Sequence, residues 1–280
     1  MVTNEEGAST GRLFYCRNEG FEIVNALKYI FFLVLLMSGH GLWAALPGSC
    51  ALEEADGTGR VRYVYDGDTV LLEDGRRVRL IGINTPEIGR DGEPSQPLAE
   101  AARDALTEML GRSRRVILRY GKERRDRYGR ILAHLYVDSA ININALLVEQ
   151  GYAAAIAVPP NLDLVDCYGT VEAAVRRAGR GIWSTDYFRP VPARRLGRDA
   201  RGFRLVTGVV RAQSHSRRSI WLSMDGRVAL RIARKDLAYF GGEDLSRYVG
   251  RKVLVRGWVH PGRDGPVMQV RHPFSLQLLD

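Results

Sequence analysis

Two carboxylates stand two residues apart at a tight turn near residue 67, a spacing at which both could bind the same ligand. The turn reads Tyr65-Asp66-Gly67-Asp68-Thr69. Carboxylate oxygens are ligands that hard divalent cations prefer. Taken alone, however, Asp-Gly is far more often a hairpin turn than a metal site. The turn therefore predicts a hairpin, and it predicts a metal site only in combination with other groups.

A second motif begins with an arginine and ends with a glutamate: Arg79-Leu80-Ile81-Gly82-Ile83-Asn84-Thr85-Pro86-Glu87. Side chains alternate between the two faces of a strand, so Arg79 is expected to share a face with Ile81 and Ile83. It would then point toward a barrel interior or a cleft, where a cation needs an anion. The Thr-Pro-Glu end by itself predicts only a turn or the start of a helix.

The third motif is Asp126-Arg127-Tyr128-Gly129-Arg130, and its last arginine enters a predicted strand. The wider stretch 112–130 carries nine basic and two acidic residues. A charge run of this kind is usually a solvated loop. Arginine also binds phosphate through its planar fork, so each motif taken singly leaves the chemistry open.

The hydrophobic pattern predicts the elements that position these motifs. Strands are expected at 61–65, 69–72, 78–83, 116–118 and 131–136, with helices from about Pro97 to Met109, at 145–150 and at 171–178. Asp66-Gly67 and Asp74-Gly75 supply hairpin turns. The order is three strands, a helix, two strands and terminal helices.

The second half of the chain repeats this order after an arginine-rich segment, 189–202, that we interpret as a basic linker. Strands are expected at 205–211, 220–223, 228–232, 253–259 and 267–270, and a helix at 235–249. This is the element order of the OB-fold, a small Greek-key barrel. Four aromatic residues there could pack in a barrel core or stack on bases, and core packing is favoured: Trp221, Trp258, Tyr248 and Phe274.

The amino-acid composition limits the kinds of molecule that the protein is expected to bind. Lys and Arg number 41 against 32 Asp and Glu, a net charge of +9, and 45% of the residues are hydrophobic. These values are typical of a folded protein and favour a polyanionic partner, which is a nucleic acid, an anionic membrane surface or an acidic glycan. Three scattered cysteines exclude a Cys-based zinc finger and a dense disulfide scaffold.

In this order along the chain, the three motifs resemble the thermonuclease (staphylococcal-nuclease-like) family. The segment Gly181-Ile182-Trp183-Ser184 is similar to the closing motif of that family, so the resemblance runs from about Arg60 to Ser184. It implies a mainly β fold with helices (α+β), in which a five-stranded OB barrel hydrolyses DNA and RNA phosphodiesters with Ca²⁺. The second, smaller barrel is OB-like.

The resemblance implies a set of metal ligands. Asp68 would be a direct Ca²⁺ ligand, the Thr85 carbonyl another, and Asp66 a supporting carboxylate. Asn84 stands where well-known members of the family carry a second ligating aspartate, so the chain loses one negative charge and should bind Ca²⁺ more weakly. A non-catalytic nucleic-acid-binding protein with two OB barrels is therefore the alternative function.

The resemblance also implies catalytic and substrate-binding roles. Glu87 would be the general base or would position water, and Arg79 and Arg130 would clamp the phosphate, while Tyr128 would hydrogen-bond a phosphate oxygen. The tyrosines that line the nucleotide pocket in the family are absent, because the chain carries Ala155-Ile-Ala-Val-Pro-Pro160 at that place.

The N-terminus predicts export. Tyr29 to Met37 is an unbroken apolar run that follows Lys28 and precedes small residues around Ala44-Ala45. This is typical of a secretory signal peptide, here residues 1–45, and indicates a periplasmic or secreted protein. Residues 1–27 form a longer and more acidic segment than a signal peptide normally has before its apolar run. This favours translation from a later start codon. An uncleaved anchor would instead keep the protein on a membrane.

Signal cleavage would remove Cys16 and leave Cys50 and Cys167. An even number of cysteines in an oxidising compartment favours a disulfide, although two separate buried thiols are the alternative. The resemblance implies that the terminal helix packs beside the first strands, which would make the two cysteines neighbours.

The sequence therefore predicts an exported, Ca²⁺-dependent endonuclease that acts on DNA or RNA. Its expected parts are a nuclease barrel at 50–188, a linker at 189–202 and an OB-like barrel at 203–280. No stable membrane association is expected once the signal is removed.

Overall fold

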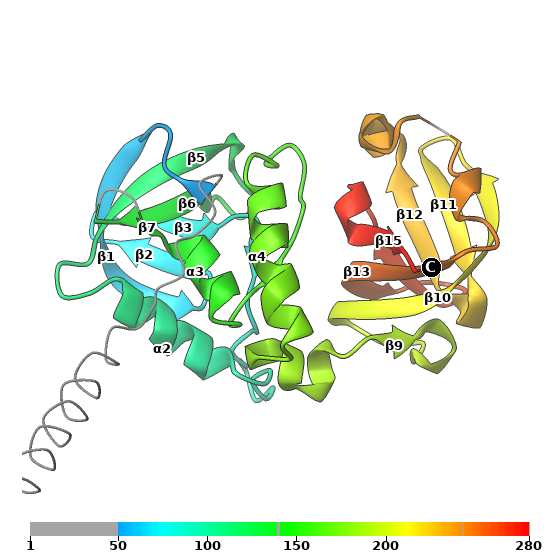
Figure 1. Ribbon diagram of the computed structural model, residues 1–280, viewed down its shortest axis with the longest axis horizontal. Helices are drawn as coiled ribbons and strands as arrows, with labels where there is room; N and C mark the ends of the chain where they lie inside the picture. Colours follow the sequence, from blue (N-terminus) through cyan, green and yellow to red (C-terminus); the bar gives the residue numbers. More distant parts are fainter. Residues whose placement is uncertain (1–49, 139–140, 243, 280) are drawn as a thin grey trace, which may run out of the picture. The chain divides into compact units, whose positions relative to one another are not determined.

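The computed structural model describes residues 50–138, 141–242 and 244–279. The predicted signal peptide 1–45 lies outside these residues. The described residues belong to one compact unit, which contains two closed five-stranded β-barrels (Figure 1). No helix in the described part of the chain is long and apolar enough to cross a membrane.

The first barrel is closed by a parallel pairing between its third and last strands. Its strand order is β3-β2-β1-β5-β6, and β3 also pairs with β6. Its strands are β1 (Gly57–Asp66), β2 (Thr69–Leu72), β3 (Arg77–Leu80), β5 (Arg115–Arg125) and β6 (Ile131–Val137). Two short additions complete this part: β7 (Ile141–Asn142) pairs with β6, and β4 (Ile83–Asn84) pairs with β8 (Ala154–Ala155). The predicted five-stranded barrel and the order of its strands along the chain are confirmed.

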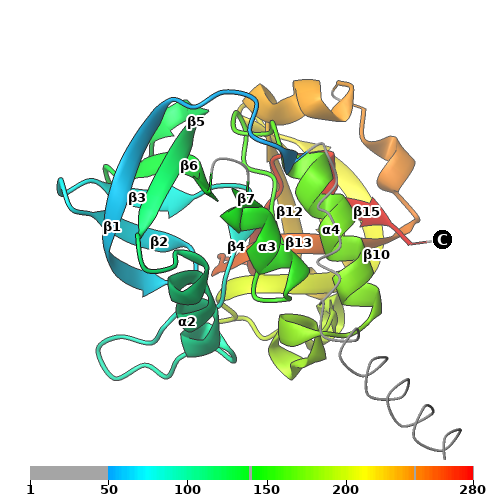
Figure 2. The ribbon, with the colours of Figure 1, turned by 60° about the vertical axis from the view of Figure 1, so that its left-hand side comes forward.

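Three helices accompany the first barrel, and Figure 2 shows α2 at one end of it. They are α2 (Ala99–Met109), α3 (Ile143–Glu149) and α4 (Val165–Arg177). The apolar face of α2 inserts Ala105 and Leu106 into the barrel core. Helix α4 begins before the predicted start at 171, because residues 164–168 already carry an apolar face that is buried on the barrel.

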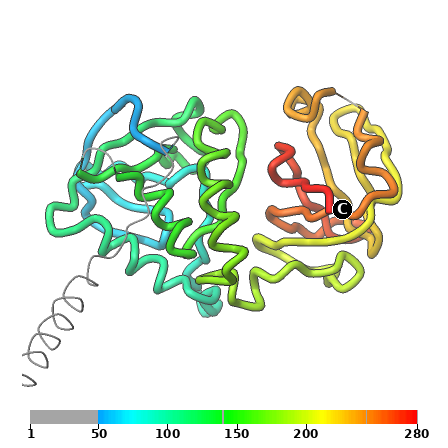
Figure 3. Tube along the Cα trace, viewed as in Figure 1, coloured from blue at the N-terminus to red at the C-terminus, as the bar shows by residue number. Residues whose placement is uncertain are grey.

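The second barrel has the strand order β13-β14-β12-β11-β10, and β10 closes it by pairing with β13. It occupies the yellow-to-red part of the trace in Figure 3. Its strands are β10 (Gly202–His215), β11 (Ser219–Met224), β12 (Ala229–Ala233), β13 (Lys252–Pro261) and β14 (Pro266–Gln269), with β9 (Val191–Pro192) and β15 (Leu276–Leu278) added at the edges.

The α-helix predicted at 235–249 is wrong. Two 3₁₀ helices stand there, η6 (Arg234–Phe240) and η7 (Ser246–Tyr248). The chain turns at Gly241 and Gly242, which both have positive φ, a conformation that glycine adopts without steric cost and that ends a helix. Other 3₁₀ helices in the described residues are η2 (Gly181–Ser184), η3 (Asp186–Phe188), η4 (Ala193–Arg195), η5 (Asp225–Arg227) and η8 (Pro273–Ser275).

The segment predicted as a linker, 189–202, has structure of its own. Strand β9 pairs in parallel with β10, and Ala193 at the start of η4 is buried in the core of the second barrel. Part of this arginine-rich segment is therefore fixed to the second barrel by backbone pairing and by apolar contact.

A buried ion pair and an apolar cluster join the two barrels. On β13, Arg256 places Nη1 2.6 Å from Oε2 of Glu172 on α4, and both side chains are at most 4% exposed. The same Nη1 donates to the carbonyl of Ala155 at 3.1 Å, and Glu172 Oε1 accepts from the Ala155 N–H at 3.0 Å. An apolar cluster also contains residues of both halves of the chain, among them Ala154, Trp183 and Phe203.

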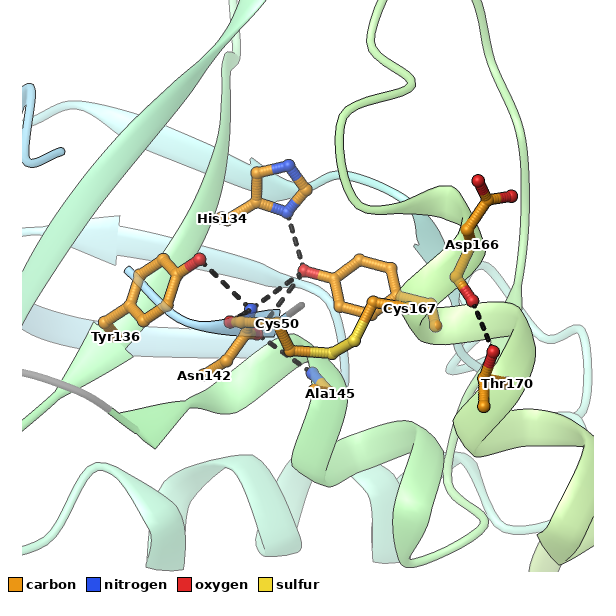
Figure 4. Close-up of a disulfide and its surroundings, with 9 residues drawn as sticks. Cys50, His134, Tyr136, Asn142, Ala145, Asp166, Cys167 and Thr170 are labelled. Carbon is orange, nitrogen blue, oxygen red and sulfur yellow. Dashed lines mark hydrogen bonds between the residues drawn. A yellow bond between two sulfur atoms is a disulfide. The ribbon is translucent and has the colours of Figure 1, made fainter. Parts of the chain in front are cut away.

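A disulfide ties the start of the described chain to α4. Cys50 and Cys167 are bonded, with their Cα atoms 5.6 Å apart and 117 residues of sequence separation (Figure 4). Beside the bond, Asn142 Nδ2 donates to the Cys50 carbonyl at 3.1 Å. His134 and Tyr168 form a buried hydrogen bond of 2.7 Å nearby, and burial lowers the pKa of His134 to about 3.

Reducing this disulfide is expected to lower the free energy of unfolding by about 2–4 kcal/mol, because a long closed loop restricts the unfolded chain. Denaturant titrations with and without reductant measure the effect, and the double variant Cys50→Ser/Cys167→Ser is the matched control that should not respond to reductant. Non-reducing peptide mapping should find the two cysteines in one linked fragment. Free thiols at both positions in the untreated protein would contradict the assignment.

Candidate active site

The carboxylate turn joins β1 to β2. The Asp66 carboxylate accepts a hydrogen bond from the backbone N–H of Asp68 at 3.0 Å, and Thr69 donates its hydroxyl to Asp68 Oδ1 at 3.2 Å. Both aspartates are buried. Gly67 is required between them, because a Cβ there would lie 2.8 Å from Ala102 Cβ and from Thr85 Cγ2. The turn is therefore held against α2 and the strand that carries the next motif.

Arg79 is the cation that faces this turn. Its Nη1 lies 2.8 Å from Asp68 Oδ2 and also donates to the Leu80 carbonyl at 2.7 Å. The predicted face is wrong: Val78 and Leu80 point into the core, and β3 ends at Leu80, so Arg79 does not share a strand face with Ile81 and Ile83. The anion expected beside Arg79 is Asp68.

Asn84 and Thr85 follow on β4 and just after it. The Thr85 N–H donates to Asp68 Oδ2 at 3.0 Å, so the second motif is joined to the carboxylate turn through its backbone. Asn84 is 1% exposed, and its Oδ1 has no hydrogen-bond partner among the described residues. Strand β4 is held by β8, where Asn84 pairs with Ala154 and Ile83 pairs with Ala155.

Glu87 is positioned by its backbone. The side-chain Oε1 of Gln96 accepts from the Glu87 N–H at 3.2 Å, and the Gln96 N–H donates to the Glu87 carbonyl at 2.9 Å. Loss of surrounding water, reinforced by the negative charge of Asp68, raises the pKa of the Glu87 carboxyl above its ordinary value. Arg79 and Arg130 act in the opposite direction.

Arg130 and Tyr128 come from the turn between β5 and β6. Arg130 Nε lies 2.7 Å from Asp126 Oδ2, and its Nη1 is 3.5 Å from the Thr69 hydroxyl of the carboxylate turn. Tyr128 is 59% exposed and accepts a hydrogen bond from Arg127 at 2.6 Å. Arg130 thus reaches the site, and Tyr128 stands at its rim.

An open cleft of about 710 Å³ brings these groups together. Asp66, Glu87, Tyr128 and Arg130 are among the residues that line it. Asp68 and Arg79 do not line the cleft. Asp68 is hydrogen-bonded to two lining residues, Asp66 and Thr69, and Arg79 forms its ion pair with Asp68. The lining therefore presents two exposed carboxylates, Glu87 and Glu93, and the guanidinium groups of Arg77, Arg90 and Arg130 to a ligand.

Two buried carboxyl groups, those of Asp66 and Asp68, lie next to each other on the turn beside the cleft. Burial and the neighbouring Asp68 carboxylate raise the pKa of Asp66 to about 7. No three His, Cys, Asp or Glu side chains in the described ranges form a group that could hold a metal ion. The acceptors present are instead two carboxylates, the Asn84 amide oxygen and backbone carbonyls.

Sequence reasoning missed several residues of the site, among them two arginines and a glutamine. Arg77 and Arg90 line the cleft, and Gln96 both lines it and holds Glu87. A sequence signal existed for Arg77, because it stands two residues before Arg79 and so shares a strand face with it. Arg90 and Gln96 lie in an irregular loop, where spacing predicts no direction for a side chain.

Comparison with known proteins identifies the family. Residues 77–185 match the family model described as "Staphylococcal nuclease homologue". A thermonuclease of Staphylococcus intermedius is 40% identical over 104 residues, which are 36% of this chain and 61% of that protein. The thermonuclease of Staphylococcus hyicus is 32% identical over 130 residues, 45% of this chain and 76% of the relative. An uncharacterized endonuclease of Escherichia coli is 34% identical over 133 residues, 46% of this chain and 79% of its own length. The chain therefore belongs to the staphylococcal nuclease family.

Proposed function

We propose that this protein hydrolyses phosphodiester bonds of DNA or RNA in the cleft of its first barrel. One observation carries the proposal: Glu87 and Arg130 line the same cleft, and two other lining residues, Asp66 and Thr69, are hydrogen-bonded to Asp68 of the Arg79–Asp68 ion pair. The names of the relatives, thermonuclease and endonuclease, support the same reaction class.

Each side chain of the cleft has a role that follows from its chemistry. Glu87 can accept a proton from an attacking water, and the raised pKa makes its carboxylate a stronger base. The Arg130 fork can bind phosphate oxygens from the cleft side while Asp126 fixes its orientation. Arg79, paired with Asp68, adds positive charge where negative charge builds up in the transition state.

We further propose that a divalent cation, Ca²⁺, is held at the base of the cleft. The residues fit such an ion: the buried Asn84 Oδ1 has no described partner, and Asp66 and Asp68 place two carboxyl groups on one short turn. Asp68, Asn84 and the Thr85 carbonyl are the proposed ligands, and Asp66 supports them. A bound Ca²⁺ would supply Lewis-acid polarisation of the phosphate.

A nuclease assay on the purified protein tests the proposed function. Linear and circular single-stranded DNA, duplex DNA and RNA are incubated with Ca²⁺ or with chelator, and products are separated on gels. Cleavage of circular DNA that depends on the cation supports an endonuclease. No cleavage of any substrate in Ca²⁺, by a protein shown to be folded, would overturn the proposal.

Replacing Asn84 by Asp is expected to lower the Ca²⁺ concentration needed for half-maximal activity, because an added negative ligand raises affinity for a hard cation. Calorimetric titration with Ca²⁺ provides a readout that does not depend on turnover. Asn84→Ala is the opposing variant and should weaken binding. Equal Ca²⁺ affinity in all three proteins would show that residue 84 is not a ligand.

We also propose that the protein is exported to the periplasm or secreted. The apolar run between Lys28 and Ser38 supports this localisation. The Cys50–Cys167 disulfide supports it as well, since such bonds persist mainly in oxidising compartments. Fractionation of the producing cells tests the location of the protein. N-terminal sequencing of the mature protein tests whether the signal peptide is removed.

A further inference from the structure

Positive charge is unevenly distributed between the two halves of the protein. Residues 50–188, which contain the cleft, carry 19 basic and 21 acidic residues, a net charge of −2. Residues 189–280 carry 19 basic and 7 acidic residues, a net charge of +12. The attraction for a polyanion therefore resides mainly in the half of the chain that lacks the proposed catalytic residues.

The outer face of β11 and β12 places an aromatic ring beside an arginine. Ile220 and Leu222 on β11 point into the barrel core, so Trp221 between them points outward and is only partly buried. Trp221 pairs directly with Arg231 on β12, which is also partly exposed. The expectation that Trp221 packs in the core is wrong, because it occupies the opposite face of its strand.

Further arginines surround this tryptophan. The turn between β10 and β11 exposes Arg217 and Arg218, and neither forms an ion pair with any described residue. The turn lies beside Trp221, since the indole Nε1 donates to Ser216 Oγ at 3.4 Å. It also lies beside Arg234, whose backbone N–H donates to the Arg218 carbonyl at 3.1 Å. We call Arg217, Arg218, Trp221, Arg231 and Arg234 the Trp221 surface.

We propose that the Trp221 surface binds single-stranded nucleic acid, and that it holds the polymer while the first barrel cleaves it. The arginines supply phosphate contacts, and the outward indole supplies a ring on which an unpaired base can stack. Bases of a duplex are already stacked on each other, so the tryptophan favours single strands. The identity of the polymer rests on the proposed function, whereas the location of the surface does not.

Fluorescence anisotropy of a labelled oligothymidylate, measured on the full protein in EDTA, tests this surface without turnover. Trp221→Ala should weaken binding roughly 5- to 150-fold, the range that corresponds to the loss of one stacked base. Trp221→Phe should restore part of the affinity. Arg217→Ala/Arg218→Ala should reduce the slope of log affinity against log salt by about 1.4, since each phosphate contact on a single strand contributes about 0.7.

The matched control is Arg177→Ala/Arg180→Ala, which removes the same charge from exposed positions at the end of α4. It should leave both the affinity and the salt slope close to wild type. Wild-type affinity in the Trp221 and Arg217/Arg218 variants, or an equal loss in the control, would overturn the proposal. Binding of phosphatidylglycerol vesicles but not of oligothymidylate would also overturn it. Because EDTA is present, a failure of the hydrolysis proposal would leave these binding results unchanged and so remain distinguishable.

Discussion

Replacement of Glu87 by Gln is expected to lower kcat for nucleic-acid cleavage by about 100- to 10,000-fold, the usual contribution of a general base. The amide has the shape of the carboxylate, and Gln96 holds residue 87 only through its backbone, so the position of the side chain should be kept. What is lost is the capacity to accept a proton. Steady-state kinetics on a labelled oligonucleotide measure kcat and KM separately, and KM should change far less than kcat.

Glu149→Gln is the matched control for this experiment. Burial also raises the pKa of Glu149, but this residue ends α3 and is not part of the cleft lining. Its replacement should leave kcat close to wild type. If Glu87→Gln cleaves DNA at the wild-type rate, the catalytic assignment is wrong, whatever the control shows.

Replacement of Arg256 by Met is expected to lower the free energy of unfolding by about 3–5 kcal/mol, because it leaves one partner of a buried ion pair without its counter-charge. Glu172 is 4% exposed at its side chain, so water cannot replace the lost guanidinium without local opening. The Ala155 carbonyl loses a donor at the same time. Urea titrations followed by circular dichroism measure the change.

Two further variants make the expectation specific to the ion pair. Glu172→Gln/Arg256→Met should be less destabilised than Arg256→Met alone, since the double change removes both charges and leaves no buried charge unpaired. Arg189→Met is the control, because the Arg189–Asp186 pair is largely exposed and such pairs contribute only about 0–1 kcal/mol. A loss below about 1 kcal/mol in Arg256→Met would show that the pair does not stabilise the protein.

Local pattern was sufficient to predict the first barrel and much of the site. The motifs around Asp68 and Glu87 lie at strand ends, where hairpin turns and alternating hydrophobicity fix the direction of the chain. Arg79 shows the limit of this reasoning. Its neighbours Ile81 and Ile83 lie beyond the end of β3, so alternation along a single strand assigned it to the wrong face.

Contacts between distant segments were not predictable in the same way. Nothing in the alternation of β13 indicates that Arg256 reaches Glu172, because their ion pair joins residues 84 positions apart. The same is true of Ala154 and Ile156, which are buried in an apolar cluster together with Phe203 and Leu205 of β10.

The disulfide has a consequence for proteolysis of the protein. Cys50 and Cys167 stand on either side of every residue proposed for catalysis or for Ca²⁺ binding, from Asp66 to Arg130. A protease that cuts one exposed loop within this interval, such as the loop around Arg90, yields two pieces that remain covalently joined. The severed strands stay at a high effective concentration and can keep their pairing in the barrel. A nicked molecule thus runs as one band on a non-reducing gel and separates into two only when the bond is reduced.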